Sequence, residues 1–227
     1  MLLKSIFALQ FLAVSLTAAS PIKHKGTSAD YGTKPQNEAL CYKGTQFPST
    51  KEWLSFDKLW AINEPVMLKS DSKSEVVAIR KYIQKAAKAA GIKKAIFLAI
   101  MMQESRGDVR TGSGDGVTPG LMQALGSPDC LGSIRGQCPH SKIEGMIFAG
   151  ALGTNLTQGL GSCYTMYGRE YGPMARCYNS GSITDPLNLE RIQFGTPSYV
   201  SDIANRLRGL EPRKDCGFGV AIPSPGF

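Results

Sequence analysis

The chain has 227 residues, of which 42% are hydrophobic, and its 26 Lys plus Arg against 18 Asp plus Glu give a formal net charge of +8 at pH 7. This balance is typical of a globular protein and excludes a coiled coil, a collagen-like repeat and a largely disordered chain. A basic surface of this kind favours an acidic partner without naming it.

The first nineteen residues have the pattern of a secretory signal peptide. A basic start at Lys4 is followed by an apolar run from Ile6 to Leu16, and Thr17 to Ala19 supply small residues for cleavage. The apolar run is too short to cross a bilayer. We therefore expect a secreted, extracellular protein with no membrane span in its mature form, in which residues 20–40 form a flexible leader and residues 41–227 form one domain.

The cysteines are even in number and would enter an oxidising compartment, which favours three disulfides. Six cysteines allow 15 pairings, and proximity in sequence suggests Cys130 with Cys138 and Cys163 with Cys177, which leaves Cys41 with Cys216. The chain has no Cys-x-x-Cys pair and only two histidines, so a zinc site or a catalytic thiol is the weaker alternative. No metal or organic cofactor is implied.

Residues 41–65 are irregular in pattern, with bulky apolar residues that would anchor the segment to a core. Ser72 and Glu75 then have the spacing of a capping box, and the apolar residues that follow at helical intervals predict a helix that Gly91 ends. A second helix is predicted from Lys93 to Ser105, with one apolar face.

Gly, Ser and Pro punctuate residues 106–140, which predicts a long Gly-rich loop with a short element near residues 121–124. Helical patterns return at residues 141–157, 173–180 and 197–207, and no stretch is rich in strand signals. We therefore predict a mainly α, disulfide-stabilised domain.

Glu104 is the first residue whose position suggests chemistry. It follows Ile100 by four residues and Met101 by three, so it projects from the apolar face of its helix. It also lies in the last helical turn, where the helix dipole disfavours negative charge. Both effects raise a carboxyl pKa, as a general acid near neutral pH requires, although a glutamate at a frayed helix end that turns to solvent would have the same spacing.

Four short motifs occur in a fixed order. They are Glu104-Ser105, then Gly120-Leu-Met-Gln123, then Ala175-x-x-Tyr178-Asn179-x-Gly181, and then Thr196-x-x-Tyr199-Val200. Together they resemble the lytic transglycosylase family and its goose-type lysozyme relatives, which share a helical lysozyme-like fold and cleave peptidoglycan. The resemblance covers roughly residues 75 to 208.

The resemblance implies a role for each matched residue. Glu104 would be the catalytic acid and Ser105 its neighbour, and the Gly120 backbone would pass near the substrate. The other matched residues would contact or hold the glycan in the cleft: Gln123, Tyr178, Asn179 and Tyr199. Leu121 and Met122 fit core positions whatever the function, and Tyr199 could also be a core aromatic.

Asp115 bears on the type of reaction. Goose-type lysozymes carry an Asp in the loop before Gly-Leu-Met-Gln and another two positions after the Gln. Asp115 could match the first, whereas Leu125 stands at the second. An inverting hydrolase needs such a second carboxylate to hold a water, whereas a transglycosylase uses its single Glu as acid and then as base. Asp115 favours hydrolysis, although it could equally be an ordinary turn residue.

We therefore expect a monomeric glycosidase that cleaves the β-1,4 bond between N-acetylmuramic acid and N-acetylglucosamine in peptidoglycan or a related aminosugar polymer, with no nucleic-acid partner. A chitin- or chitosan-cleaving enzyme of the same fold is one alternative, and a non-catalytic wall-binding or toxin-like protein is another. Asn155-Leu-Thr157 also fits an N-glycosylation sequon.

Overall fold

The computed structural model describes residues 38–114 and 116–219. The predicted signal peptide, most of the predicted leader and Asp115 lie outside the described residues. The part of the chain that is described contains seven helices and no strand, apart from an isolated bridge between Gly153 and Gln158. The helices are α1 (Phe56–Met67), α2 (Lys73–Ala89), α3 (Lys94–Ser105), α4 (His140–Leu152), α5 (Leu160–Met166), α6 (Tyr171–Ser180) and α7 (Tyr199–Leu207).

Helix α2 begins and ends where the sequence predicts. The Ser72 side chain accepts a hydrogen bond from the Glu75 backbone, and the Glu75 carboxylate accepts one from the Ser72 backbone, which completes the capping box. Gly91 follows the helix with a φ of 67°, a conformation that glycine adopts without strain. The prediction of this helix is confirmed.

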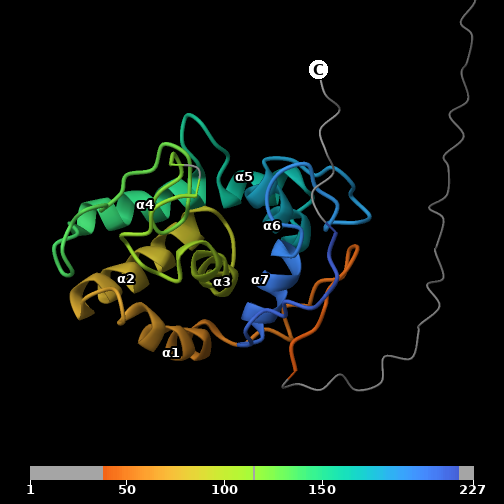
Figure 1. The fold of residues 1–227 in the computed structure, drawn as a ribbon, viewed down its shortest axis with the longest axis horizontal. Helices are drawn as coiled ribbons and strands as arrows, with labels where there is room; N and C mark the ends of the chain where they lie inside the picture. The colour runs from red at the N-terminus through yellow and green to blue at the C-terminus, as the bar shows by residue number, and fades with distance from the viewer. Residues whose placement is uncertain (1–37, 115, 220–227) are drawn as a thin grey trace, which may run out of the picture. The chain divides into compact units, whose positions relative to one another are not determined.

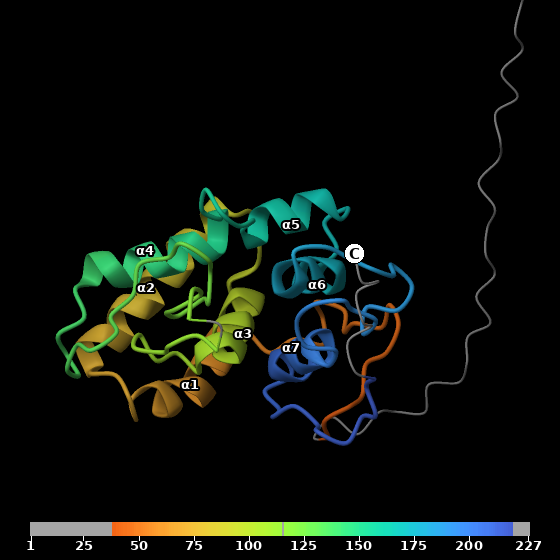
Figure 2. The same ribbon diagram turned by 45° about the horizontal axis from the view of Figure 1, so that its top comes forward.

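Helix α3 lies at the centre of the fold and packs against α1, α2 and α7. Figures 1 and 2 show it between α2 and α4 on one side and α6 and α7 on the other. The sequence predicted one apolar face, but α3 is buried on nearly all sides from Ala95 to Met102. A helix that is apolar all round belongs in a core, and its last turn is where Glu104 meets neighbouring elements.

Two helices, α1 and α5, were not predicted from the sequence, and two predicted elements differ from those in the structure. Helix α1 begins at the Ser55 cap and contains Pro65 in its last turn, which obscures its pattern. Helix α5 is a short segment without a side-chain cap. Helix α4 ends at Leu152 rather than at residue 157, and the short element predicted near residues 121–124 is a turn over residues 121–123.

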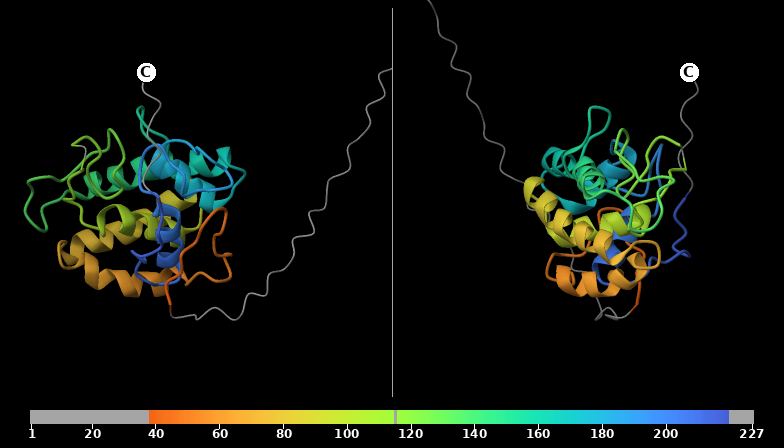
Figure 3. Two further views of the ribbon diagram at one scale, coloured as in Figure 1. Left: turned by 45° about the vertical axis from the view of Figure 1, so that its right-hand side comes forward. Right: turned by 90° about the vertical axis from the view of Figure 1, so that its left-hand side faces the viewer.

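Three disulfides are present, in the pairing that proximity suggested: Cys41–Cys216, Cys130–Cys138 and Cys163–Cys177. The first joins Cys41 and Cys216, near the two ends of the described chain, and Figure 3 shows the N-terminal segment (orange) beside α7 (blue). Leu40 adds to this junction, because its backbone N–H donates to the Asn205 side chain (2.8 Å) and its carbonyl accepts from it (2.7 Å). The N-terminal end of the described chain is therefore tied to helix α7 and, through Cys41–Cys216, to the C-terminal segment.

Candidate active site

Glu104 stands in the last turn of α3, half-buried among neighbouring helices. Burial raises the pKa of Glu104 to about 7, while a hydrogen bond from the Tyr199 hydroxyl to its carboxylate acts in the opposite direction. Because this pKa is close to 7, Glu104 is protonated in a large fraction of the molecules near neutral pH. The structure therefore gives Glu104 the property that a general acid requires.

Tyr199 is the first residue of α7, and only 2% of it is exposed. Burial raises the pKa of Tyr199 well above its ordinary value, and the nearby charge of Glu104 adds to the effect. The phenol therefore stays protonated and donates its hydrogen bond to the carboxylate. Helix α7 thus positions Glu104 through a buried hydroxyl, a contact between residues 95 positions apart in the sequence.

Tyr178, on α6, contacts the Gly-Leu-Met-Gln turn. Its hydroxyl donates to the Met122 carbonyl at 2.7 Å. Burial raises the pKa of Tyr178 well above its ordinary value, and the charge of Glu104 contributes to this shift, so the two side chains lie close together. Tyr178 therefore joins the turn to the surroundings of the acid.

The Gly-Leu-Met-Gln turn is tied to the end of α3 by Ser105. The Ser105 hydroxyl donates to the Leu121 carbonyl at 2.9 Å and accepts from the Gly107 N–H at 3.1 Å. Within the turn, the Gln123 side chain donates to the Gly120 carbonyl at 2.9 Å. These contacts hold the turn beside Glu104.

Residue 120 must be glycine for two reasons: its backbone conformation and the lack of room for a side chain. Its φ is 84°, and a Cβ atom built there would lie 2.5 Å from the Met146 Sδ atom and 3.2 Å from the Pro128 carbonyl oxygen. A side chain would have to displace this backbone from helix α4. Glycine therefore lets the turn lie close to α4 and to the end of α3.

Asn179 contacts the segment before α7. Its Oδ1 atom accepts hydrogen bonds from the Thr196 N–H (2.8 Å) and from Arg176 Nη1 (3.0 Å). The sequence assigned Asn179 to holding the glycan, but this side of its carboxamide binds within the protein. The contact fixes the loop that leads into Tyr199.

Arg176 is a residue that the sequence analysis missed. It is fully buried on α6, and its guanidinium donates to the Thr196 carbonyl at 2.9 Å and lies 6.0 Å from the centre of the Tyr199 ring. Burial lowers the pKa of Arg176 to about 10, which still leaves it charged near neutral pH. It occupies a variable position inside the Ala175-x-x-Tyr178 motif, so the pattern carried no signal for it.

The described chain thus brings four of the predicted site elements together around Glu104: Ser105, the turn from Gly120 to Gln123, Tyr178 and Tyr199. Asp115 lies outside the described residues. Within the described ranges, no group of three or more His, Cys, Asp or Glu side chains is arranged to hold a metal ion, and no helix there is both long and apolar enough to cross a bilayer.

A comparison with protein families gives one finding. Residues 81–128 match the family model described as the Transglycosylase SLT domain, a segment that contains Glu104 and the Gly-Leu-Met-Gln turn. No curated protein matches the chain. Members of the matched family are peptidoglycan-cleaving lytic transglycosylases. The motifs and the surroundings of Glu104 agree with this match, so the segment around Glu104 is similar to the lytic transglycosylase family.

Proposed function

We propose that this chain is a secreted glycosidase that cleaves the β-1,4 bond between N-acetylmuramic acid and N-acetylglucosamine, with Glu104 as its general acid. The observation that carries the proposal is the half-buried Glu104 carboxyl with a pKa of about 7, held by Tyr199 at the end of a central helix. The family match over residues 81–128 supports peptidoglycan as the substrate.

In the first step, protonated Glu104 gives its proton to the glycosidic oxygen, and the bond between that oxygen and the anomeric carbon breaks. Tyr199 holds the carboxyl in place, and Tyr178 fixes the neighbouring turn through the Met122 carbonyl. In a lytic transglycosylase, the ionised Glu104 then takes the proton of the muramic acid 6-hydroxyl as this oxygen attacks the anomeric carbon. The product carries a 1,6-anhydro ring.

The same arrangement suggests the roles of the surrounding elements. We assign the fold to the lysozyme-like class, with the segment between α3 and α4, residues 106–139, as the loop that borders the glycan. Gln123, half-buried within this segment, would contact a sugar. Asn179 contributes by holding the loop that leads into Tyr199.

The two alternatives make different demands on Glu104. A non-catalytic wall-binding or toxin-like protein would need neither the carboxyl nor its raised pKa, so the burial of Glu104 beside Tyr199 favours an active enzyme. A chitin-cleaving enzyme could use the same acid, and only the substrate separates it from a peptidoglycan-cleaving one.

The test uses the purified chain, the variant Glu104→Gln and the matched control Glu64→Gln, which changes another half-buried glutamate in the same way. Each is incubated with purified peptidoglycan and with chitin, and the products are identified by mass spectrometry. We expect muropeptides from the wild type and the control only. Activity that survives Glu104→Gln would remove Glu104 from the mechanism, and products from chitin alone would establish the alternative substrate.

A variant of Asp115 distinguishes hydrolysis from transglycosylation. If Asp115 holds a water, Asp115→Asn lowers the rate sharply, and wild-type products carry reducing ends. If Glu104 works alone, the variant keeps its activity and the products are 1,6-anhydro sugars. The loop position of Asp115 favours the first result, and the family match favours the second.

Export and modification are part of the same proposal. Cleavage after Ala19 would give a mature chain that begins at Ser20, which N-terminal sequencing of the protein from the culture medium would detect. Asn155 is exposed in the loop that follows α4, where a glycan would be accessible to enzymes of the secretory route. A glycosidase-sensitive mass increase that Asn155→Gln abolishes would identify it.

A further inference from the structure

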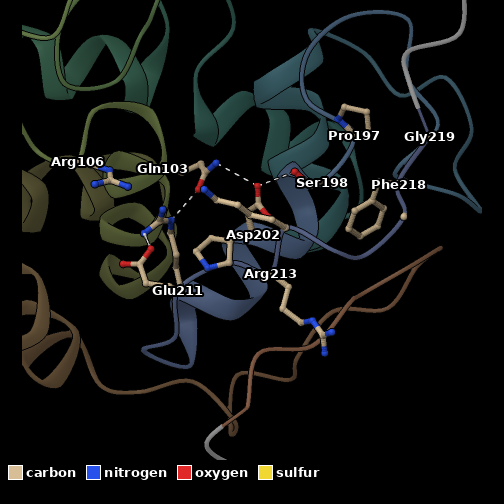
Figure 4. Close-up of a pocket in the computed structure, with 13 residues that line it drawn as sticks. Gln103, Arg106, Pro197, Ser198, Asp202, Glu211, Arg213, Phe218 and Gly219 are labelled. Atoms are coloured by element: carbon tan, nitrogen blue, oxygen red, sulfur yellow. Dashed lines mark hydrogen bonds and ion pairs between the residues drawn. The ribbon is translucent and has the colours of Figure 1, made fainter.

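A cavity of about 700 Å³ is lined by the sequence neighbours Gln103 and Arg106 of the proposed acid, and none of its lining residues is assigned to the cleavage step (Figure 4). It is formed by the end of α3, by α7 and by the segment from Glu211 to Gly219. Gln103 and Arg106, which flank Glu104 in sequence, line its α3 side, and Phe218 lies at the opposite end. The cavity has the size of a site for a small ligand.

A chain of polar contacts forms one side of this cavity. The Gln103 side chain donates to Asp202 Oδ2 (3.3 Å) and accepts from Arg206 Nε (2.7 Å), and the Ser198 hydroxyl also donates to Asp202 Oδ2 (2.9 Å). Glu211 lies 3.8 Å from Arg206 at the end of this chain. Figure 4 shows Gln103, Asp202 and Ser198 joined by these contacts. The network holds Arg206 in place, with its charge directed at the cavity.

Two further cations that line the cavity are exposed. Arg106 is exposed, and within residues 38–114 and 116–219 it makes no ion pair or hydrogen bond through its side chain. Its charge lies close enough to Arg206 to lower the pKa of that guanidinium, in addition to the larger effect of burial. Lys214 is exposed on the opposite segment. Like charges held this close are stabilised by an anion between them.

The other lining groups indicate which functional groups a ligand of this cavity carries. Arg213 is already bound, because its guanidinium pairs with Asp215 and lies 3.6 Å from Glu38. Phe218 and the rings of Pro197 and Pro212 add apolar surface. A ligand that fits this lining has carboxylates for Arg106 and Lys214 and aliphatic groups for the rings, and Glu211 could pair with an amino group.

We propose that this cavity binds the short acidic peptide that branches from N-acetylmuramic acid. The inference rests on the proposed function, since that peptide is attached to one of the two sugars joined by the scissile bond. The lining residues Gln103 and Ser198 directly precede Glu104 and Tyr199 in the chain, so a peptide seated in the cavity would lie next to the cleaved glycan. Chitin has no such branch, and the cavity would make the enzyme select peptide-bearing strands.

Binding is measured first, without turnover. The probe is a synthetic stem tetrapeptide with free carboxylates and an acetylated N-terminus (N-acetyl-L-Ala, γ-D-Glu, L-Lys, D-Ala), titrated into Glu104→Gln by calorimetry. The double variant Arg106→Gln/Lys214→Gln, in the same background, should bind it about 3- to 30-fold more weakly, as expected for the loss of two partly screened ion pairs. Lys85→Gln/Lys88→Gln removes the same charge from exposed positions on α2 and should bind the peptide like its parent.

Turnover is measured second, as the ratio of kcat/KM for peptide-bearing glycan to kcat/KM for glycan stripped of its peptides. The ratio should fall in the Arg106/Lys214 variant and stay constant in the Lys85/Lys88 control. Absence of peptide binding, or equal weakening in both double variants, would overturn the proposal. A protein that binds the peptide through Arg106 and Lys214 but cleaves no glycan would retain this site and refute the proposed function instead.

Discussion

The raised pKa of Glu104 predicts that Glu104→Gln changes the pH dependence of stability as well as activity. Below the ordinary glutamate pKa, the side chain is protonated in both the folded and unfolded states, and the two proteins differ little. As pH rises towards 7, Glu104 ionises in the unfolded wild type while it stays protonated in the folded wild type. The free energy of unfolding of the wild type therefore falls. Glutamine does not titrate, and the variant avoids this loss.

The size of the effect follows from the pKa of about 7 in place of the ordinary glutamate value of 4.5. At about 1.4 kcal/mol for each pKa unit, the loss approaches 3 kcal/mol when pH passes 7. The advantage of Glu104→Gln in free energy of unfolding should therefore grow by up to that amount between pH 4 and pH 8.5. For a domain of this size it corresponds to a melting temperature raised by roughly 6–12 °C at pH 8.5 relative to the wild type.

Urea and thermal unfolding of both proteins, followed by circular dichroism with the disulfides intact, would measure this difference. Other titrating groups, such as the buried Asp71, are common to both proteins and cancel in the comparison. The same variant should lose about 10²–10⁴-fold in activity, since an amide delivers no proton. A difference in stability that is the same at pH 4 and pH 8.5 would refute the raised pKa and, with it, the physical basis for Glu104 as an acid.

Three further predictions follow from the contacts described above. Tyr199→Phe removes a hydrogen bond that lowers the pKa of Glu104, so the basic limb of the pH profile of kcat/KM should move about one unit higher; a limb that stays in place would contradict the assignment. Cys41→Ala/Cys216→Ala opens a bridge of sequence separation 175 and should lower the free energy of unfolding by about 5 kcal/mol in the chain-entropy description, against about 3 kcal/mol for Cys163→Ala/Cys177→Ala with a separation of 14, and denaturant titrations would show whether this order holds. Lysis of whole cells should weaken as salt shortens the Debye length from about 10 Å at 0.1 M to about 3 Å at 1 M, whereas cleavage of a small neutral oligosaccharide should not, and equal salt dependence would contradict attraction by the basic surface.

Local sequence rules were sufficient for the elements whose signals are contained within a few residues. The capping box of α2 is one example, since Ser72 and Glu75 are in contact because of their spacing alone. The position of Glu104 on the apolar side of its helix is another. Cysteine proximity suggested two disulfides with short separations, and the third pair followed by elimination. The sequence also contained the motifs that indicated the family.

Other features depend on contacts between residues that are distant in the chain. The Tyr199 hydroxyl reaches Glu104 only because α7 packs against α3, so the motif left open whether Tyr199 belonged to the core or to the site. Asn179 and Arg176 meet at Thr196 because α6 and the segment before α7 fold together, and no spacing rule predicts that contact. Helix α1, with Pro65 in its last turn, gains its stability from burying Leu59 and Trp60 rather than from its own propensity.

The sequence by itself determined the helical character of the chain and the residue that could serve as acid, because each of these depends on local periodicity or residue type. For the cysteines, proximity suggested one of 15 pairings, and the tertiary structure decided it. The tertiary structure decided the protonation of Glu104, since burial among α3, α6 and α7 raises its pKa. It also created the cavity between Arg106, Arg206 and Lys214, where cations from three separate segments of the chain lie around one space. Desolvation and the proximity of charges are properties of packing, and packing between distant segments has no counterpart in local sequence.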